Sequence, residues 1–214
     1  MGKPGIRETQ NKKIKKKLLN TALKLFREHG YYNVSVDEIV EKANSSKGAF
    51  YNHFGSKDEV IIFYLESWDP LYLKYYKDVL LSPDYPGKHA LDKIRDMFLY
   101  IISVLAKQGE EVARVSSSYL LRDFNAGKIN IGPQRKYISI MTQLIHEGRE
   151  DGSIPTCLSD EELMRILTIL SRGVINDWGI NRGSYDIQSA GRIIIDMFCQ
   201  SIGGRHSLCG YPVQ

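Results

Sequence analysis

The chain has 214 residues, of which 43% are hydrophobic and 25% are charged. This is the composition of a globular protein long enough to bury a core, and it excludes a fibrous or disordered chain. The longest apolar run, Met97 to Ala106, is far shorter than the ~20 residues that span a bilayer, and no apolar segment follows the first lysines as in a secretory signal. The three cysteines are an odd number without close spacing. We therefore expect a cytoplasmic protein with no membrane partner.

The net charge of +4 is concentrated at the N-terminus. Residues 1–27 carry seven lysines and two arginines against the single acid Glu8, whereas residues 61–214 together sum to −1. A lysine run such as Lys12 to Lys17, taken alone, is most often a solvated helix face or a disordered arm. Beside a DNA-binding motif the same run neutralises phosphates and releases counterions.

The first predicted helix runs from about Thr9 to His29, and Gly30 ends it. Apolar residues recur along it at helical spacing. They are Ile14, Leu18, Ala22, Leu25 and Phe26. We expect this helix to brace the two short helices that follow, because helices of that length are not stable alone.

Two short helices joined by a tight turn are predicted between residues 35 and 57. Ser35 and Glu38 have the spacing of a capping box at the start of the first helix. Asn44 follows it and tolerates the left-handed conformation that ends a helix. Ser46 can cap the second helix, and Phe50 lies on its buried side. A helix, a short turn and a second helix form the helix-turn-helix arrangement, whose second helix enters the DNA major groove.

This segment resembles the DNA-binding signature of the TetR family of bacterial transcriptional regulators. The resemblance covers about residues 10–65, and the rest of the chain is similar to the family only in length and helical pattern. Family members usually carry Ala-Gly-Val or a similar triplet where this chain has Ala43-Asn44-Ser45. The matching residues are Ser35, Ile39, Ala43, Ser46-Lys47-Gly48-Ala49-Phe50-Tyr51, His53-Phe54 and Ser56-Lys57-Asp58.

The resemblance implies a double-stranded DNA operator as partner and supplies candidate contacts. Lys47, near the start of the second helix, can reach a base edge or a phosphate. Lys57, at the next helix start, lies beside free N–H groups that favour an anion. Taken singly, Tyr51 could be a half-buried aromatic and His53 an ordinary surface residue. The full set of DNA-binding candidates is Ser35, Ser46, Lys47, Gly48, Ala49, Tyr51, Asn52, His53 and Lys57.

The chain after Ser56 reads as helix throughout, which predicts an all-α fold of about nine helices. Breaks rich in proline, glycine and asparagine separate the segments. We expect an N-terminal DNA-binding domain at 1–56, an effector-binding and dimerisation domain at 57–203, and a frayed tail at 204–214. The predicted helices are Lys57–Leu81, His89–Lys107, Glu110–Phe124, Pro133–Glu150, Asp160–Asn181 and Ile187–Ile202.

Motifs typical of an enzyme or a metal centre are missing from the larger region. It has no glycine-rich phosphate loop, and its histidines do not pair at metal-ligand spacing. Cys199, His206 and Cys209 lie close in sequence but lack the four regularly spaced ligands of a structural zinc site. The acidic run that begins at Asp160 reads as the first turn of a helix. We expect neither a cofactor nor a catalytic group.

Aromatic and mildly polar residues mixed into the helix faces point to a small-molecule site. A stripe of aromatics is more often a packed core, but the resemblance implies an effector pocket between helices. If Arg122 points inward, it would favour an acidic ligand. The candidate lining residues are Trp68, Phe98, Ile102, Ser116, Tyr119, Arg122, Tyr137, Met141 and Trp178.

A homodimer is expected, because one recognition helix reads only a few base pairs and two must lie roughly 34–36 Å apart to enter successive major grooves. The last two helices are the candidate interface, through Ile169, Ile175, Ile194 and Phe198. The sequence thus predicts a repressor released from a palindromic operator by an effector. Two alternatives stay open: an all-α enzyme or carrier with an incidental helix-turn-helix, and an effector-free DNA binder that acts with a protein partner.

Overall fold

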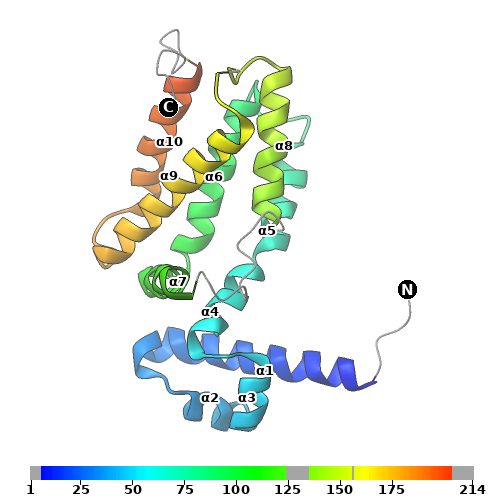
Figure 1. Ribbon diagram of the computed structural model, residues 1–214, viewed down its shortest axis with the longest axis vertical. Helices are drawn as coiled ribbons and strands as arrows, with labels where there is room; N and C mark the ends of the chain where they lie inside the picture. The colour runs from blue at the N-terminus through cyan, green and yellow to red at the C-terminus, as the bar shows by residue number, and fades with distance from the viewer. Residues whose placement is uncertain (1–5, 124–134, 156, 204–214) are drawn as a thin grey trace.

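The computed structural model describes residues 6–123, 135–155 and 157–203, and within them every regular element is a helix (Figure 1). The all-α class is thereby confirmed. Within the described residues, no helix is both long and apolar enough to cross a membrane.

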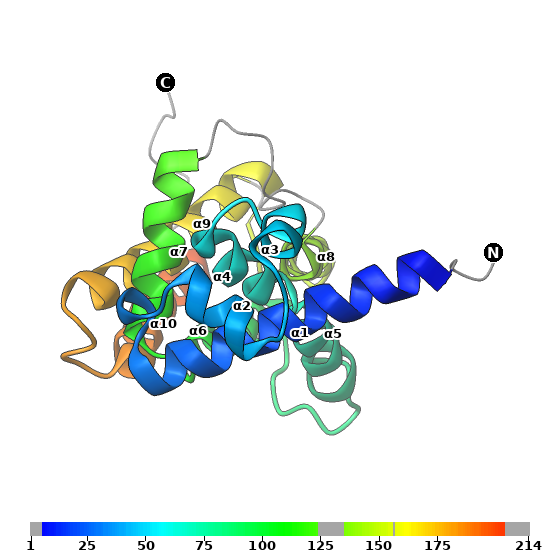
Figure 2. The ribbon, with the colours of Figure 1, turned by 90° about the horizontal axis from the view of Figure 1, so that it is seen from below.

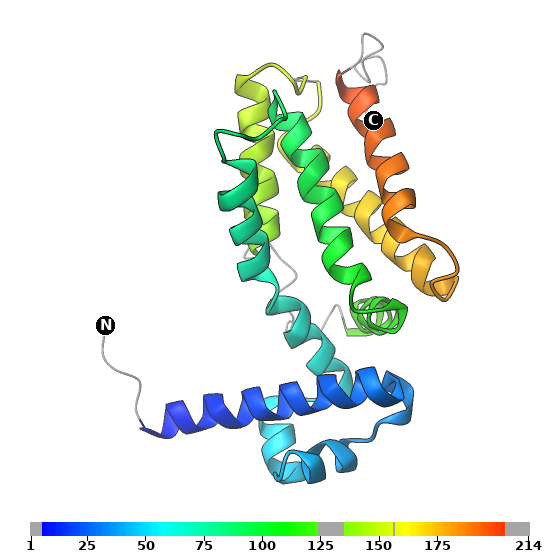
Figure 3. The same cartoon turned by 180° about the vertical axis from the view of Figure 1, so that it is seen from behind.

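The N-terminal unit consists of α1 (Ile6–His29), the 3-10 turn η1 (Tyr31–Asn33), α2 (Val36–Lys42) and α3 (Lys47–His53). The helix α1 starts three residues before the predicted Thr9. It lies across this end of the molecule, between the pair α2 and α3 and the remaining helices, and its first turns extend beyond the rest of the unit (Figures 1 and 3).

Side-chain caps fix the two short helices as the sequence predicts. The Ser35 hydroxyl oxygen accepts a hydrogen bond from the Glu38 N–H at 3.1 Å, and that of Ser46 accepts one from Ala49 N–H at 3.1 Å. The reverse bond from Glu38 that would complete a capping box is not made. Asn44 has φ 45°, so the predicted left-handed turn between α2 and α3 is confirmed.

The predicted long fourth helix is wrong, because the chain there forms α4 (Lys57–Glu66), α5 (Asp69–Tyr75) and the π-helical segment η2 (Tyr76–Leu80). The interruption lies at Ser67 and Trp68, just before Pro70 near the start of α5. Proline has no N–H to donate to the preceding turn and its ring clashes with that turn's carbonyl. In the sequence, Pro70 marks the position of this break.

The remaining helices are α6 (Ala90–Ala106), α7 (Glu110–Asp123), α8 (Lys136–Glu150), α9 (Asp160–Ile180) and α10 (Ile187–Gly203). Their positions agree with the prediction to within a few residues. Ser159 and Glu162 form a complete capping box at the start of α9, with N–H to oxygen distances of 2.7 and 3.2 Å. The acidic run from Asp160 is therefore a helix start, as expected. Cys157 is disulfide-bonded, whereas disulfides are rare in the cytoplasmic proteins that the cysteine pattern favours.

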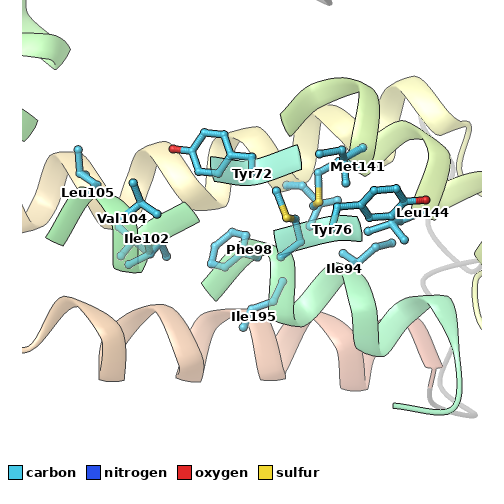
Figure 4. Close-up of a cluster of buried hydrophobic side chains, with 14 of the residues drawn as sticks. Tyr72, Tyr76, Ile94, Phe98, Ile102, Val104, Leu105, Met141, Leu144 and Ile195 are labelled. Carbon is cyan, nitrogen blue, oxygen red and sulfur yellow. The ribbon is translucent and has the colours of Figure 1, made fainter. Parts of the chain in front are cut away.

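Buried side chains form two clusters, one in each part of the molecule. The N-terminal cluster joins α1, α2 and α3 and also takes Val60 and Ile61 of α4. The larger cluster is centred on α6, where Phe98 and Ile102 meet Ile195 of α10 (Figure 4). Because the first cluster continues into α4, the domain boundary at residue 56 stays a prediction. The predicted tail at 204–214 lies outside the described residues.

Candidate nucleic-acid interface and ligand cavity

The helix α3 has one buried and one exposed face. Phe50 and Phe54 are 0% and 1% exposed, and their ring centroids lie 5.4 Å apart within the N-terminal core. Tyr51, by contrast, is 54% exposed, and Asn52 is exposed beside it. Seen from below, α2 and α3 lie on the side of the molecule that faces away from α8 to α10 (Figures 1 and 2). The exposed face of α3 is therefore free of contact with α8 to α10.

Lys47 is held in place at the start of α3 by Asp37 of α2. The Lys47 Nζ lies 2.6 Å from Asp37 Oδ1, and both side chains are more than half exposed. The hydrogen bond from Asp37 and its charge raise the pKa of Lys47, so this lysine stays charged. An exposed pair adds little stability. A phosphate or base oxygen could therefore replace Asp37 at small cost to the fold.

The free protein does not require a glycine at position 48. A Cβ at this position would meet only the Ser46 hydroxyl oxygen, at 3.9 Å, which is an ordinary contact. Its φ is not in the left-handed region, and it lies in the first turn of an exposed helix. The absence of a side chain there is explained if another molecule approaches this turn closely.

Lys57 is engaged within the protein rather than extended from it. Its ammonium donates to the carbonyls of Tyr31 and Val34, each at 2.8 Å, and lies 4.1 Å from the Tyr31 ring centroid. Burial lowers the pKa of Lys57. The side chain joins the start of α4 to η1, and two of its three protons are not available to a phosphate.

The basic run on α1 is divided between two environments. Lys15 Nζ lies 3.3 Å from the Phe63 ring centroid, and burial lowers the pKa of Lys15. Burial, and then the nearby Lys15 charge, lower the pKa of His53. Lys12 pairs with Glu8 at 2.7 Å on the surface, while the neighbouring lysines 13, 16 and 17 are exposed. These exposed lysines lie in the N-terminal half of α1, whose first turns extend beyond the rest of the unit (Figure 3).

The assignment of the remaining candidates to DNA binding stays a prediction. Ser35 and Ser46 use their hydroxyl oxygens as helix caps, which positions the backbone rather than a reading side chain. Ala49 is half-buried and the exposed Tyr51 follows it by two residues. Gly48, Tyr51 and Asn52 are all exposed.

A cavity of about 440 Å³ lies within the larger part of the molecule. Six helices, α4 to α9, contribute to its wall, together with Trp68 between α4 and α5 and Arg135 just before α8. The described lining residues are Leu65, Trp68, Tyr72, Ile101, Leu105, Ser116, Ser117, Arg135, Tyr137, Thr168, Ser171, Arg172, Ile175 and Asn176.

Some predicted ligand residues line this cavity and others do not. Trp68, Ser116 and Tyr137 line it. Tyr119 and Arg122 lie on α7, but their side chains are outside the described part of the structure. The other four, Phe98, Ile102, Met141 and Trp178, are not among the described lining residues.

Those four side chains have other roles. Phe98, Ile102 and Met141 are at most 3% exposed and fill the solid core around α6 (Figure 4). The Trp178 indole N–H donates to the Tyr185 carbonyl at 3.0 Å, which fixes the turn between α9 and α10. Sequence spacing identified inward-facing residues but could not separate core from cavity.

The predicted dimer residues lie on different faces. Ile169 is 61% exposed, Ile175 lines the cavity, and Ile194 and Phe198 are half-buried against the larger core. The neighbouring residues Ile193 and Met197 are 61% and 62% exposed. The exposed apolar residues of α10, Ile193 and Met197, therefore each precede a predicted contact residue by one position.

A metal centre has no support in the described chain. No group of three or more His, Cys, Asp or Glu side chains that could hold a metal occurs among the described residues. Cys199 lies on α10, half-buried, and burial raises the pKa of its thiol to about 12. The other members of the sequence cluster, His206 and Cys209, lie outside the described residues.

Comparison with known proteins shows that the N-terminal unit matches a described protein family. Residues 18–62 match the family described as bacterial regulatory proteins, tetR family. The DNA-binding unit of this chain is a TetR-family domain. The chain is accordingly a DNA-binding transcriptional regulator and not an enzyme.

Relatives extend this similarity along the chain. The probable acrEF/envCD operon repressor of Escherichia coli K12 is 22% identical over 190 residues, which cover 86% of this chain and 84% of that protein. Thermus thermophilus FadR, solved with lauroyl-CoA, superimposes with a TM-score of 0.69 at 18% identity over 94% of this chain and 100% of its own. Bacillus subtilis FadR, solved with stearoyl-CoA, gives 0.62 at 17% identity over 87% and 98%.

Proposed function

We propose that this TetR-family chain is a repressor that binds a palindromic operator as a homodimer and leaves it when a small molecule enters the cavity. The observation that carries this proposal is that α4 and α7 contribute both to the cavity wall and to the core of the DNA-binding unit. A ligand in the cavity therefore touches helices on which the reading head rests.

DNA reading is assigned to the exposed face of α3. Lys47 and Tyr51 lie one helical turn apart, so both can reach one stretch of groove. Gly48, between them, leaves room for the DNA backbone. The exposed lysines on the first half of α1 are assigned to flanking phosphates, where they contribute affinity without sequence preference.

The ligand is assigned to the cavity of about 440 Å³. Pockets for small molecules are mostly apolar with a few placed polar groups and fall between ~300 and ~1,000 Å³. Leu65, Ile101, Leu105 and Ile175 supply the apolar wall. The FadR proteins of Thermus thermophilus and Bacillus subtilis hold lauroyl-CoA and stearoyl-CoA, which supports an amphipathic effector. The cavity also argues against an effector-free DNA binder, because such a protein does not need a ligand pocket.

The signal from cavity to reading head is assigned first to α7. Ser116 and Ser117 of α7 line the cavity, and the preceding residue, Val115, is buried in the N-terminal cluster. One turn earlier, the Glu111 carboxylate accepts a hydrogen bond from the Tyr31 backbone N–H at 2.7 Å. Movement of α7 therefore acts on η1, which leads directly into α2 and α3.

A second connection runs through α4. Leu65 lines the cavity, while Val60 and Ile61, one turn and more before it, are buried with the N-terminal core. Either connection releases DNA only if the ligand binds the DNA-incompetent arrangement more tightly than the competent one.

The dimer is assigned to the outward faces of α9 and α10. Ile169 on α9 and Ile193 and Met197 on α10 are each more than 60% exposed. Exposed large apolar side chains on neighbouring helices are typical of an interface that a second copy covers.

DNA selection from a random-sequence library tests the proposal. The purified protein should enrich a palindrome with half-sites about 10 base pairs apart. A variant with Lys47→Ala and Tyr51→Ala should enrich nothing, although its thermal unfolding stays close to that of the wild type. Enrichment of the same palindrome by both proteins would place the reading surface elsewhere.

A further inference from the structure

Two side chains that line the cavity carry hydrogen-bond donors without a partner among the described residues. Trp68 is 5% exposed and Tyr72 is 3% exposed, and both line the cavity. Neither the Trp68 indole N–H nor the Tyr72 hydroxyl hydrogen-bonds to any residue that the structure describes. These two donors are therefore available to a molecule in the cavity that accepts hydrogen bonds.

Both donor atoms keep some accessible surface. Within the described residues, Arg149 Nη1 is the side-chain atom that is both fully enclosed and without a partner. The Trp68 and Tyr72 donors are therefore accessible, although their side chains are almost wholly buried. In Figure 4 the Tyr72 hydroxyl points toward the end of the core where Leu105, another lining residue, lies. Burial also raises the pKa of Tyr72, so the hydroxyl keeps its proton.

Positive charge on the cavity wall is not fully balanced. Arg135 is paired: its Nε lies 2.9 Å from Asp69 Oδ1, and its Nη2 donates to the Leu65 carbonyl at 2.9 Å. Arg172, an exposed residue of α9, lines the cavity and makes no ion pair with any described residue. No acidic side chain is among the described lining residues. The wall therefore presents two guanidinium groups, of which one has no counter-charge.

The uncharged polar groups on α7 and α9 add one free donor group and several acceptors. The Ser117 hydroxyl hydrogen-bonds to Asn176 Oδ1, which leaves the Asn176 amide N–H₂ without a described partner. Ser116 and Thr168 direct their protons to carbonyls of their own helices, at 2.7 Å each. Their oxygens can still accept from a ligand hydroxyl.

We infer that the effector is an organic acid with an apolar, partly aromatic body, whose anionic group is bound by Arg172 with Tyr72 and Trp68 donating to its oxygens. The inference rests on the proposed function of the cavity and specifies the ligand's chemistry. Charged donor groups bind anions with short, strong hydrogen bonds. An ammonium ligand of the same size is excluded, because it meets two guanidinium groups and no carboxylate.

Two fluorescent dyes with nearly the same body test this. The dye 8-anilinonaphthalene-1-sulfonate carries an anionic group, and N-phenyl-1-naphthylamine has the same rings without it. The wild-type protein should bind the sulfonate at least tenfold more tightly. Arg172→Gln should abolish that preference, and Tyr72→Phe and Trp68→Phe should each weaken the sulfonate severalfold while the uncharged dye binds as before. Decanoate should displace the uncharged dye, and decylamine should not.

Arg165→Gln is the matched control, because Arg165 is an exposed arginine on the same helix and is not among the described lining residues. It should keep the preference for the sulfonate. Equal affinity for the two dyes in the wild type, or a preference that survives Arg172→Gln, overturns the inference.

A cavity-blocking variant, Ser171→Trp, separates this inference from the proposed function. If blocking abolishes binding of both dyes but the wild type does not prefer the sulfonate, the cavity holds ligands and only the acid preference is wrong. If both dyes bind the blocked variant as they bind the wild type, or if neither dye binds the wild type, the cavity is not the ligand site and both proposals fail.

Discussion

Gly48→Ala should change stability and DNA binding in opposite directions. In the free protein the added Cβ has only the Ser46 hydroxyl oxygen near it, at 3.9 Å. Alanine is favoured over glycine in a helix by roughly 0.5–1 kcal/mol, and Gly48 is in the first turn of α3, so we take the lower value. At 2–4 °C per kcal/mol for a chain of this size, the melting temperature should rise by about 1–2 °C.

The operator affinity should fall at the same time. The new methyl group occupies space that we assign to the DNA backbone, so α3 must withdraw or lose contacts. We expect at least a tenfold loss, which corresponds to about 1.4 kcal/mol. Fluorescence anisotropy with an operator taken from the selection experiment measures the affinity, and differential scanning calorimetry measures the stability.

Gly173→Ala is the matched control for this experiment. Its Cβ also enters open space on an exposed helix, but α9 lies far from α3 (Figure 1). At concentrations where both variants sediment as dimers, Gly173→Ala should gain stability and keep its operator affinity. If Gly48→Ala binds the operator as tightly as the wild type, DNA does not approach this turn of α3.

Four further predictions follow from other contacts. Lys47→Ala should weaken operator binding at least tenfold in an anisotropy titration, with little change in melting temperature, because its pair with Asp37 is exposed. Glu111→Gln should leave ligand affinity intact, measured by calorimetry, but reduce the effect of ligand on operator affinity, because it weakens the bond to η1. Met197→Asp should split the dimer in sedimentation at micromolar concentration. The depressed pKa of His53 means that the unfolded chain binds this proton first, so stability should fall as pH drops below about 6.5 and His53→Gln should reduce that loss in calorimetric scans.

Local features of the fold could be predicted from the sequence, because their causes lie within a few residues. Ser46 caps α3 through an N–H three residues away, and Asn44 adopts the left-handed turn. The break before α5 is also local, and Pro70 marks it. Each of these features is determined by how one side chain affects the backbone within a few residues of it.

The site depended on contacts between distant residues, which the sequence does not display. Lys57 looks like a phosphate ligand by position, but carbonyls about 25 residues earlier take its protons. Lys15 belongs to a basic run, yet it packs on an aromatic ring of α4. Arg135, just before α8, and Arg172, on α9, are far apart in sequence, yet both line the cavity. Helical periodicity finds an inward face, but it cannot tell a filled core from a cavity.

The central claim is that the cavity and α3 are energetically coupled, and operator affinity measured with and without a cavity ligand tests it most directly. The ligand is any compound that raises the melting temperature of the wild type but not of Ser171→Trp. Saturating amounts should weaken operator binding by the wild type at least tenfold in an anisotropy titration and leave the Ser171→Trp variant unaffected. An operator affinity that stays the same when such a ligand fills the cavity would contradict the account.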